Sequence, residues 1–134
     1  MVVYTPQTKH TEECVLYVAM NNKTVRERDG FKAIEFPFPS HAANLADISL
    51  TKRYPESGFA VNDVVSHFVY VISGRVLLMR KELADNVQGF ELRAGDGVYI
   101  EPGTGYYWDP LPEVRLAVFC TPPWTAEQHR TISE

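Results

Sequence analysis

Apolar and polar residues alternate along most of this chain in short runs, and glycine, proline and asparagine separate these runs. Alternation with a period of two places successive side chains on opposite faces of a β-strand. The runs that predict strands cover residues 15–20, 31–36, 46–54, 64–79, 87–93, 98–100, 106–108 and 113–120. Many short strands separated by turn residues, with almost no helical period, indicate an antiparallel sandwich or barrel.

The longest apolar block is Val64–Met79, which we expect to be broken at Ser73-Gly74. Both of its faces are apolar, so both must be covered. We expect one face to line a barrel interior, and its residues are Val65, His67, Val69 and Val71. The other face carries Val64, Phe68, Tyr70 and Ile72. An N-terminal arm or a second subunit would cover this face, and we therefore expect a homodimer.

A strand between two glycine turns follows at residues 95–108, GDGVYIEPGTGYYW. Gly95 and Gly97 supply turn geometry before it, and Pro102-Gly103 supplies the turn after it. Asp109-Pro110-Leu111-Pro112 predicts a further turn. Thr125–Arg130 carries a capping-box pattern, which predicts one short helical turn near the end of the chain.

Composition narrows the functional classes. The 134 residues are enough for one domain with its own core. With 13 basic and 17 acidic residues and no basic cluster, the chain is a poor candidate for nucleic-acid binding. No apolar run approaches the length of a membrane helix and the first ten residues do not resemble a signal peptide, so we expect a soluble, cytoplasmic protein. Cys14 and Cys120 form no CxxC motif, and we expect two reduced, buried thiols, although pairing between them stays open.

Two stretches resemble the signatures of the cupin superfamily. Residues 95–106 resemble the second signature, in which a histidine that binds metal stands where this chain has Tyr106. Residues 67–74 resemble the end of the first signature, and His67 stands at the position of its glutamate. The two histidines expected shortly before it are absent from residues 60–63. The resemblance implies an all-β, antiparallel jelly-roll barrel formed by one domain, 1–134, with a core at about 45–123, strands or an arm at 1–44 and a tail at 124–134.

A barrel of this type is a cup, so function is expected among its inward polar residues. His67 is the first candidate, and strand parity adds Asp63 on the same face. Tyr106 comes from the second signature, Trp108 follows by parity, and Arg80 lies on the strand after Gly74. We expect His10, His41 and His129 to be exposed to solvent.

Three functions fit these residues. The first is a pocket that binds a small molecule without metal, in which His67 transfers a proton, Asp63 orients it and Tyr106 stabilises an oxyanion, as in an isomerase, lyase or dehydratase. The second is an enzyme that uses Fe, Mn, Zn or Ni at His67 with atypical ligands. The third is a structural or regulatory dimer, in which His67 is a hydrogen-bonded core residue and the aromatic rings form wall. The resemblance does not choose among them, because cupins include several enzyme classes and plain binding proteins.

Overall fold

The computed structural model describes residues 23–36, 42–81 and 86–133, which form nine antiparallel strands and one turn of 3-10 helix. The strands are β1 (Thr24–Arg28), β2 (Phe31–Phe36), β3 (Asn44–Leu50), β4 (Phe59–Asn62), β5 (Ser66–Lys81), β6 (Val87–Arg93), β7 (Gly97–Ile100), β8 (Gly105–Thr121) and β9 (His129–Ile132). The predicted all-β antiparallel architecture is confirmed. The described part of the chain contains no helix with the length and hydrophobicity of a membrane span.

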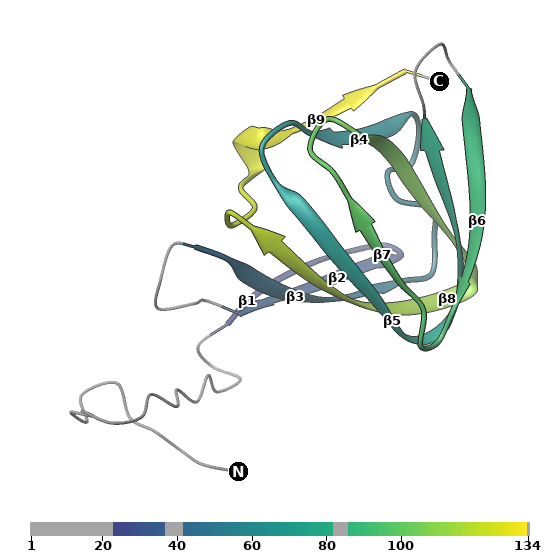
Figure 1. The fold of residues 1–134 in the computed structure, drawn as a ribbon. Helices are drawn as coiled ribbons and strands as arrows, with labels where there is room; N and C mark the ends of the chain where they lie inside the picture. Colours follow the sequence, from purple (N-terminus) through teal and green to yellow (C-terminus); the bar gives the residue numbers. More distant parts are fainter. Residues whose placement is uncertain (1–22, 37–41, 82–85, 134) are drawn as a thin grey trace.

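Two long strands, β5 and β8, organise the sheet. They pair from Ser66 opposite Thr121 to Lys81 opposite Gly105. The free edge of β5 pairs with β6 and β7, and the other edge of β8 pairs with β3 and β4. Figure 1 shows the sheet curling around an interior, with β1, β2 and β3 extending it on one side and β9 lying beside β4.

Two predicted breaks lie inside continuous strands. Gly74 does not end a strand, and β5 passes through it with irregular register on either side. Its φ of +81° is one that residues with a side chain rarely adopt, and a Cβ here would lie 2.2 Å from the carbonyl oxygen of Glu113. The turn predicted at residues 109–112 is likewise part of β8. Pro112 falls in the stretch where the pairing to β5 is interrupted, and such irregularities accommodate proline.

The N-terminal strands were predicted only in part. β2 alternates as expected, with Phe31 and Ala33 buried. β1 was missed because its sequence, TVRER, has too few apolar residues to show a period. Its register with β2 places Arg26 opposite Ala33 and Arg28 opposite Phe31. The strand predicted at 15–20 lies outside the described residues.

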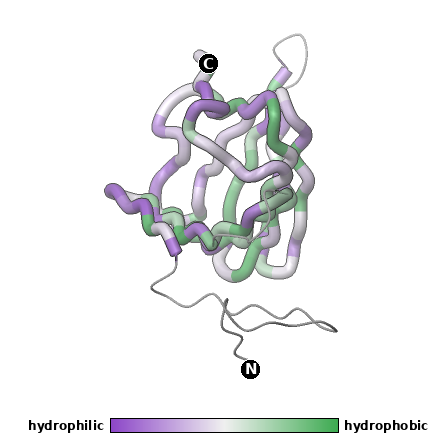
Figure 2. The backbone as a smooth tube through the Cα atoms, turned by 90° about the vertical axis from the view of Figure 1, so that its left-hand side faces the viewer, coloured by the Kyte–Doolittle hydropathy of each residue, from purple (hydrophilic) through white to green (hydrophobic). Residues whose placement is uncertain are grey.

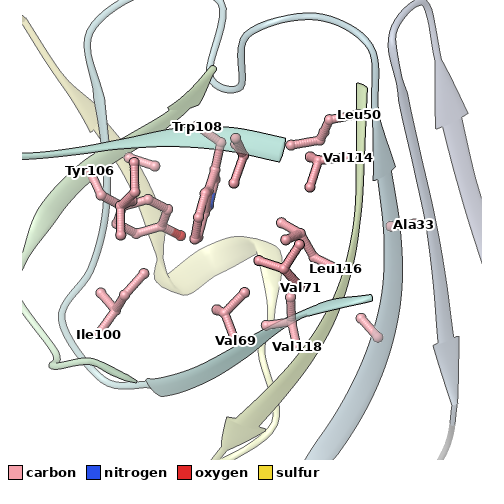
Figure 3. Packing of buried hydrophobic residues seen from close by; sticks show 14 of the residues in the cluster. Ala33, Leu50, Val69, Val71, Ile100, Tyr106, Trp108, Val114, Leu116 and Val118 are labelled. Carbon is pink, nitrogen blue, oxygen red and sulfur yellow. The ribbon is translucent and has the colours of Figure 1, made fainter. Parts of the chain in front are cut away.

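The interior is lined by one face of every long strand. The predicted inward residues His67, Val69 and Val71 on β5, and Val65 just before it, are all buried. Figure 3 shows the rings of Tyr106 and Trp108 side by side in this interior, with aliphatic side chains of neighbouring strands around them. The tube in Figure 2 changes repeatedly between hydrophobic and hydrophilic, as expected for strands with only one face inside.

The chain ends with a short segment that closes one side of the interior. The predicted helical turn is a 3-10 turn at Ala126–Gln128, and the Oε1 of Gln128, its last residue, accepts a hydrogen bond from Thr125 N at 3.0 Å. Trp124 packs against the core, as expected for a residue that covers a barrel edge. β9, which was not predicted, then pairs with β4.

Candidate functional site

His67 is the buried polar residue around which the site is built. It lies on β5 opposite Ile100 of β7 and Cys120 of β8, and only 6% of its surface is exposed. Its Nδ1 is buried, and no described residue forms a hydrogen bond with it. Burial, followed by the charge of His129, lowers the pKa of His67 to about 4. The imidazole is therefore neutral at physiological pH.

Tyr106 and Trp108 lie beside this imidazole. The ring centroids of His67 and Tyr106 are 6.0 Å apart with an interplanar angle of 67°, and Tyr106 meets Trp108 in the same edge-to-face manner at 6.1 Å. Burial raises the pKa of the Tyr106 phenol well above its usual range, which keeps it protonated. These three residues, predicted to face one hollow, are brought together as expected.

They line an inner cavity of about 70 Å³. Most of its wall is aliphatic or aromatic, and its polar lining comes from six residues on several strands, Arg26, Glu35, Asn44, Tyr54, His67 and Tyr106. The volume is well below the 300–1,000 Å³ of pockets that enclose a drug-sized ligand. A small polar group fits here, whereas a large molecule does not.

Three residues of this lining each carry a buried polar atom without a hydrogen-bond partner among the described residues, and these atoms are Arg26 Nε, Asn44 Oδ1 and His67 Nδ1. A buried polar atom without a partner costs free energy, so such atoms are rare in native proteins. Three around one cavity, two of them able to accept a proton or hydrogen bond, indicate a space suited to a polar guest. Arg26 also binds Glu35, through Nη2 to Oε1 at 2.5 Å.

An open surface groove of about 530 Å³, here called the vestibule, shares two lining residues, Tyr54 and Trp124, with the inner cavity. His129 stands between these two rings, at 6.3 Å from Tyr54 and 6.1 Å from Trp124. The expectation that His129 is exposed to solvent was wrong, because β9 brings it under the rings. Burial, together with the charges of Arg28 and Arg26, lowers its pKa.

Asp63 does not face the interior. The parity inference was wrong because the chain turns between β4 and β5, where the buried Asn62 accepts hydrogen bonds at its Oδ1 from the backbone N–H groups of Val64 and Val65. Asp63 is exposed and forms an ion pair with Arg130, with a shortest distance of 2.7 Å. This hydrogen-bonded partner lowers the pKa of the carboxyl. Asp63 therefore cannot orient His67 in this structure.

Arg80 lies in a separate groove of about 430 Å³, with Phe90, Glu101 and Tyr106 among its lining residues. Its Nη2 donates to Gln88 Oε1 at 2.7 Å, and its guanidinium lies 5.4 Å from the centroid of the Phe90 ring. Arg80 is paired directly across strands with Tyr106 but does not line the inner cavity. The structure thus separates Arg80 from His67.

Several polar residues of the site were not predicted. The alternation of β2 places Glu35 on the same face as Phe31 and Ala33, so this carboxylate was within reach of sequence reasoning. Arg26 belongs to a strand without a hydrophobic signal, and Tyr54 reaches the site through an isolated bridge to Trp108. Cys120 is a buried free thiol, and burial raises its pKa to about 12. Cys14, His10 and His41 lie outside the described residues.

The cupin resemblance implies a metal site, but the donor side chains of the described residues do not fit one. Within residues 23–36, 42–81 and 86–133, no three His, Cys, Asp or Glu side chains group closely enough to hold an ion. Near His67 the neighbouring ring is the protonated phenol of Tyr106, and Glu35 is engaged by Arg26. We therefore assign no step to a metal.

Comparison with known proteins supports the architecture. The sequence matches no protein-family model and no curated protein. A structure of Streptomyces Pac13 with uridine aligns with a TM-score of 0.73 at 13% identity, covering 89% of this chain and 92% of Pac13. Pac13 is described as a nucleoside dehydratase with a β-barrel. Oxalate decarboxylase from Bacillus subtilis aligns with a TM-score of 0.71 at 13% identity, over 95% of this chain and 36% of that one.

This chain has the cupin fold. The oxalate decarboxylase of Lactobacillus farciminis gives the same result, with a TM-score of 0.70, 15% identity and coverage of 84% of this chain and 34% of the enzyme. At these identities the likeness establishes the fold alone. The cupin barrel places the inward faces of β5 and β8 around one hollow, which is where His67 and Tyr106 lie.

Proposed function

We propose that this cupin binds a small polar molecule in the inner cavity and transfers a proton to or from it without a metal, as a dehydratase, lyase or isomerase does. The observation that carries the proposal is the neutral His67 imidazole, which lines the same cavity as Tyr106 and whose buried Nδ1 has no hydrogen-bond partner among the described residues. Acid–base catalysis requires at least one group that accepts a proton and one that donates a hydrogen bond beside the same ligand, and the imidazole and the phenol meet this requirement.

The two side chains divide the chemistry. In the tautomer that carries its hydrogen on Nε2, His67 accepts a proton from the ligand at Nδ1. The Tyr106 hydroxyl donates a hydrogen bond to the oxygen on which negative charge develops. The same imidazolium then returns the proton to a departing hydroxyl, which leaves as water in a dehydration, or to another carbon in an isomerisation. Aliphatic walls strengthen both interactions by excluding water.

The likeness to Pac13 favours the dehydration form of this reaction. Structures of Pac13 with uridine include variants in which a histidine is replaced by glutamine or a tyrosine by phenylalanine. A histidine and tyrosines also surround the cavity of this chain. The cavity volume of about 70 Å³ favours a reacting group smaller than a whole nucleoside.

Tryptophan fluorescence tests the proposal directly, because both tryptophans of the chain, Trp108 and Trp124, line the cavity. Uridine and a panel of small hydroxylated carbonyl compounds would be titrated in the presence of EDTA, and product formation followed by NMR. We expect a compound that changes the emission of the wild type but not of His67→Gln. Tyr99→Phe is the matched control, since Tyr99 is exposed and bonds Ser66 on the outside.

A result in which binding and turnover are equal in the wild type and His67→Gln would reject the proposal. Activity that is lost with EDTA and restored by one metal would favour the metal enzyme instead.

A second role concerns the outer face of the barrel. Phe68 pairs across strands with Tyr99 on one side and Phe119 on the other, and the row continues through Leu45 to Phe36. Phe68 and Tyr99 are both more than half exposed. Five strands spaced by about 4.8 Å make this a band nearly 20 Å long. We propose that two copies of the chain pair through this outer row, because contiguous apolar surface of this kind marks an interface.

A further inference from the structure

The charged strand β1 brings two arginines to the inner side of the sheet. Its register with β2 places Arg26 and Arg28 on the face that also carries Phe31 and Ala33, whereas Glu27 pairs with Lys32 on the opposite face. Arg26 is half-buried and paired with Glu35, whereas Arg28 is exposed near the end of the strand. Arg28 is therefore accessible to a ligand from solvent.

Arg28 is held by aromatic rings. Its guanidinium carbon lies 4.3 Å from the centroid of the Phe31 ring and 5.4 Å from that of Tyr54. It forms no ion pair with a carboxylate of the described residues, in contrast to Arg26, which binds Glu35. Part of this guanidinium is engaged by the Tyr54 phenol, and its remaining N–H groups are available for a carboxylate or phosphate, because a guanidinium carries five donors.

Arg28 brings a positive charge to the lining of the vestibule. The charges of Arg28 and Arg26 lower the pKa of His129, and the same two arginines act on the phenol of Tyr54 in the direction that stabilises its anion. Glu56 also lines the vestibule but is not among the charges that shift either group. A negative group in this space is therefore favoured by both arginines.

The inner cavity continues the same site. Arg26 lies with its guanidinium 4.3 Å from the centroid of Trp124, and its buried Nε lacks a partner among the described residues. His67, more than nine-tenths buried, lines the same cavity, and its Nδ1 has no hydrogen-bond partner among the described residues. Arginine N–H donors thus lie on the vestibule side of the site, and the imidazole of His67, an acceptor, lies on the inner side.

The two volumes set the shape of the ligand. The vestibule of about 530 Å³ holds a sizeable group, while the inner cavity of about 70 Å³ holds only a few heavy atoms. Tyr54 and Trp124, which line both, would flank the middle of the ligand.

We infer that the ligand of this site is an anion, whose carboxylate or phosphate group binds Arg28 in the vestibule while its polar, reacting end enters the inner cavity beside His67. This inference rests on the proposed function, because it names the class of substrate for the same site. Arg28 is a binding residue in it and takes no part in proton transfer.

The test uses inorganic phosphate and succinate as probes, titrated into the full-length protein at constant ionic strength. Tryptophan fluorescence reports binding, and NMR reports the pKa of His129. Arg28→Gln removes the proposed contact, and Lys32→Gln is the control, because it removes one positive charge from the outer face of the neighbouring strand. We expect saturable binding that weakens about tenfold in Arg28→Gln and is unchanged in Lys32→Gln.

Bound anion should also raise the pKa of His129 in the wild type by neutralising the arginines, and this shift should be absent in Arg28→Gln. Tighter binding of phosphate identifies a phosphate ester as the ligand class, and tighter binding of succinate identifies a carboxylic acid. Binding of neither probe, or equal binding in wild type and Arg28→Gln, overturns the inference.

The fate of the proposed function is read separately from His67→Gln. If neutral compounds bind and depend on His67 while anions do not depend on Arg28, only the anion inference fails. If anions depend on Arg28 but no compound depends on His67, the anion site stands without the proposed chemistry.

Discussion

His67 and Tyr106 meet edge to face inside the barrel, with ring centroids 6.0 Å apart, although 38 positions separate them along the chain. Neither strand alone creates this contact. It depends on the pairing of β5 with β8, in which Arg80 lies opposite Tyr106 and His67 lies opposite Cys120. The curl of the sheet then brings the two ends of this ladder face to face across the lumen.

Tyr106→Phe should separate catalysis from folding. No hydrogen bond within the described residues involves the Tyr106 hydroxyl, so its removal should cost less than about 1 kcal/mol of stability. Loss of the oxyanion donor should lower turnover by about a hundredfold or more. Urea unfolding and initial rates are the measurements. Unchanged turnover would remove Tyr106 from the chemistry.

The pH dependence of stability should report His67. The unfolded chain binds a proton at the ordinary pKa of 6.5, whereas the folded chain does so only near 4, so stability is lost as the pH falls through this window. Between about pH 7.5 and 5.5 this group alone should remove roughly 1.4 kcal/mol. His129 acts in the same direction. Urea unfolding at a series of pH values should show that the free energy of unfolding of His67→Gln depends less steeply on pH than that of the wild type. The same pH dependence in both proteins would contradict the burial of a neutral imidazole.

Gly74→Ala should be much more damaging than Gly95→Ala. Both glycines have positive φ, +81° and +97°, so alanine is strained at either position. Only at Gly74 would the new Cβ also meet a backbone atom, at 2.2 Å, while no atom lies within 4 Å of the corresponding point at Gly95. The difference in unfolding free energy should be about 1–3 kcal/mol. Equal losses of unfolding free energy in the two variants would mean that β8 moves away from the new Cβ at position 74 without cost.

Asp63→Ala should leave the site intact. The carboxylate pairs with Arg130 on the surface and does not line the inner cavity, so ligand affinity and turnover should match the wild type. Exposed ion pairs contribute little, and any loss of stability should diminish further in high salt. A large loss of turnover would show that Asp63 takes part in catalysis.

Tyr70→Glu should test the outer row as an interface. Tyr70 lies on the same face of β5 as Phe68 and is 47% exposed, so the charge does not disturb the core. Light scattering should give the mass of a dimer for the wild type and of a monomer for Tyr70→Glu. A monomeric wild type would contradict pairing through this face and leave the N-terminal arm or another protein to cover it.

The fold could be predicted from the sequence because two signals agree on the strand boundaries. These signals are the alternation of apolar and polar residues within strands and the glycine or proline between them. His67 and the valines beside it were placed correctly, since burial alternates regularly from Ser66 to Ile72, before the irregular register around Gly74. Asp63 was misplaced by the same rule. The turn made by Asn62 changes the face, and no periodicity reveals that the Asn62 side chain accepts hydrogen bonds from the backbone N–H groups of Val64 and Val65.

The rest of the site could not be found from patterns. Arg26 and Arg28 lie in a strand whose residues carry no hydrophobic period, and they face inward only because β2 fixes the register. His129 sits beside Trp124 through the pairing of β9 with β4, which joins residues far apart in the chain. Long-range pairing of this kind leaves no local trace in the sequence.

The inner cavity and the groove of Arg80 have two lining residues in common, Tyr106 and Ile100. These side chains are a thin partition across the bore of the barrel. Shortening Ile100 would open a passage from one hollow to the other without altering the imidazole. A barrel built this way can acquire longer substrates through a single aliphatic substitution, because Ile100 takes no part in the proposed chemistry.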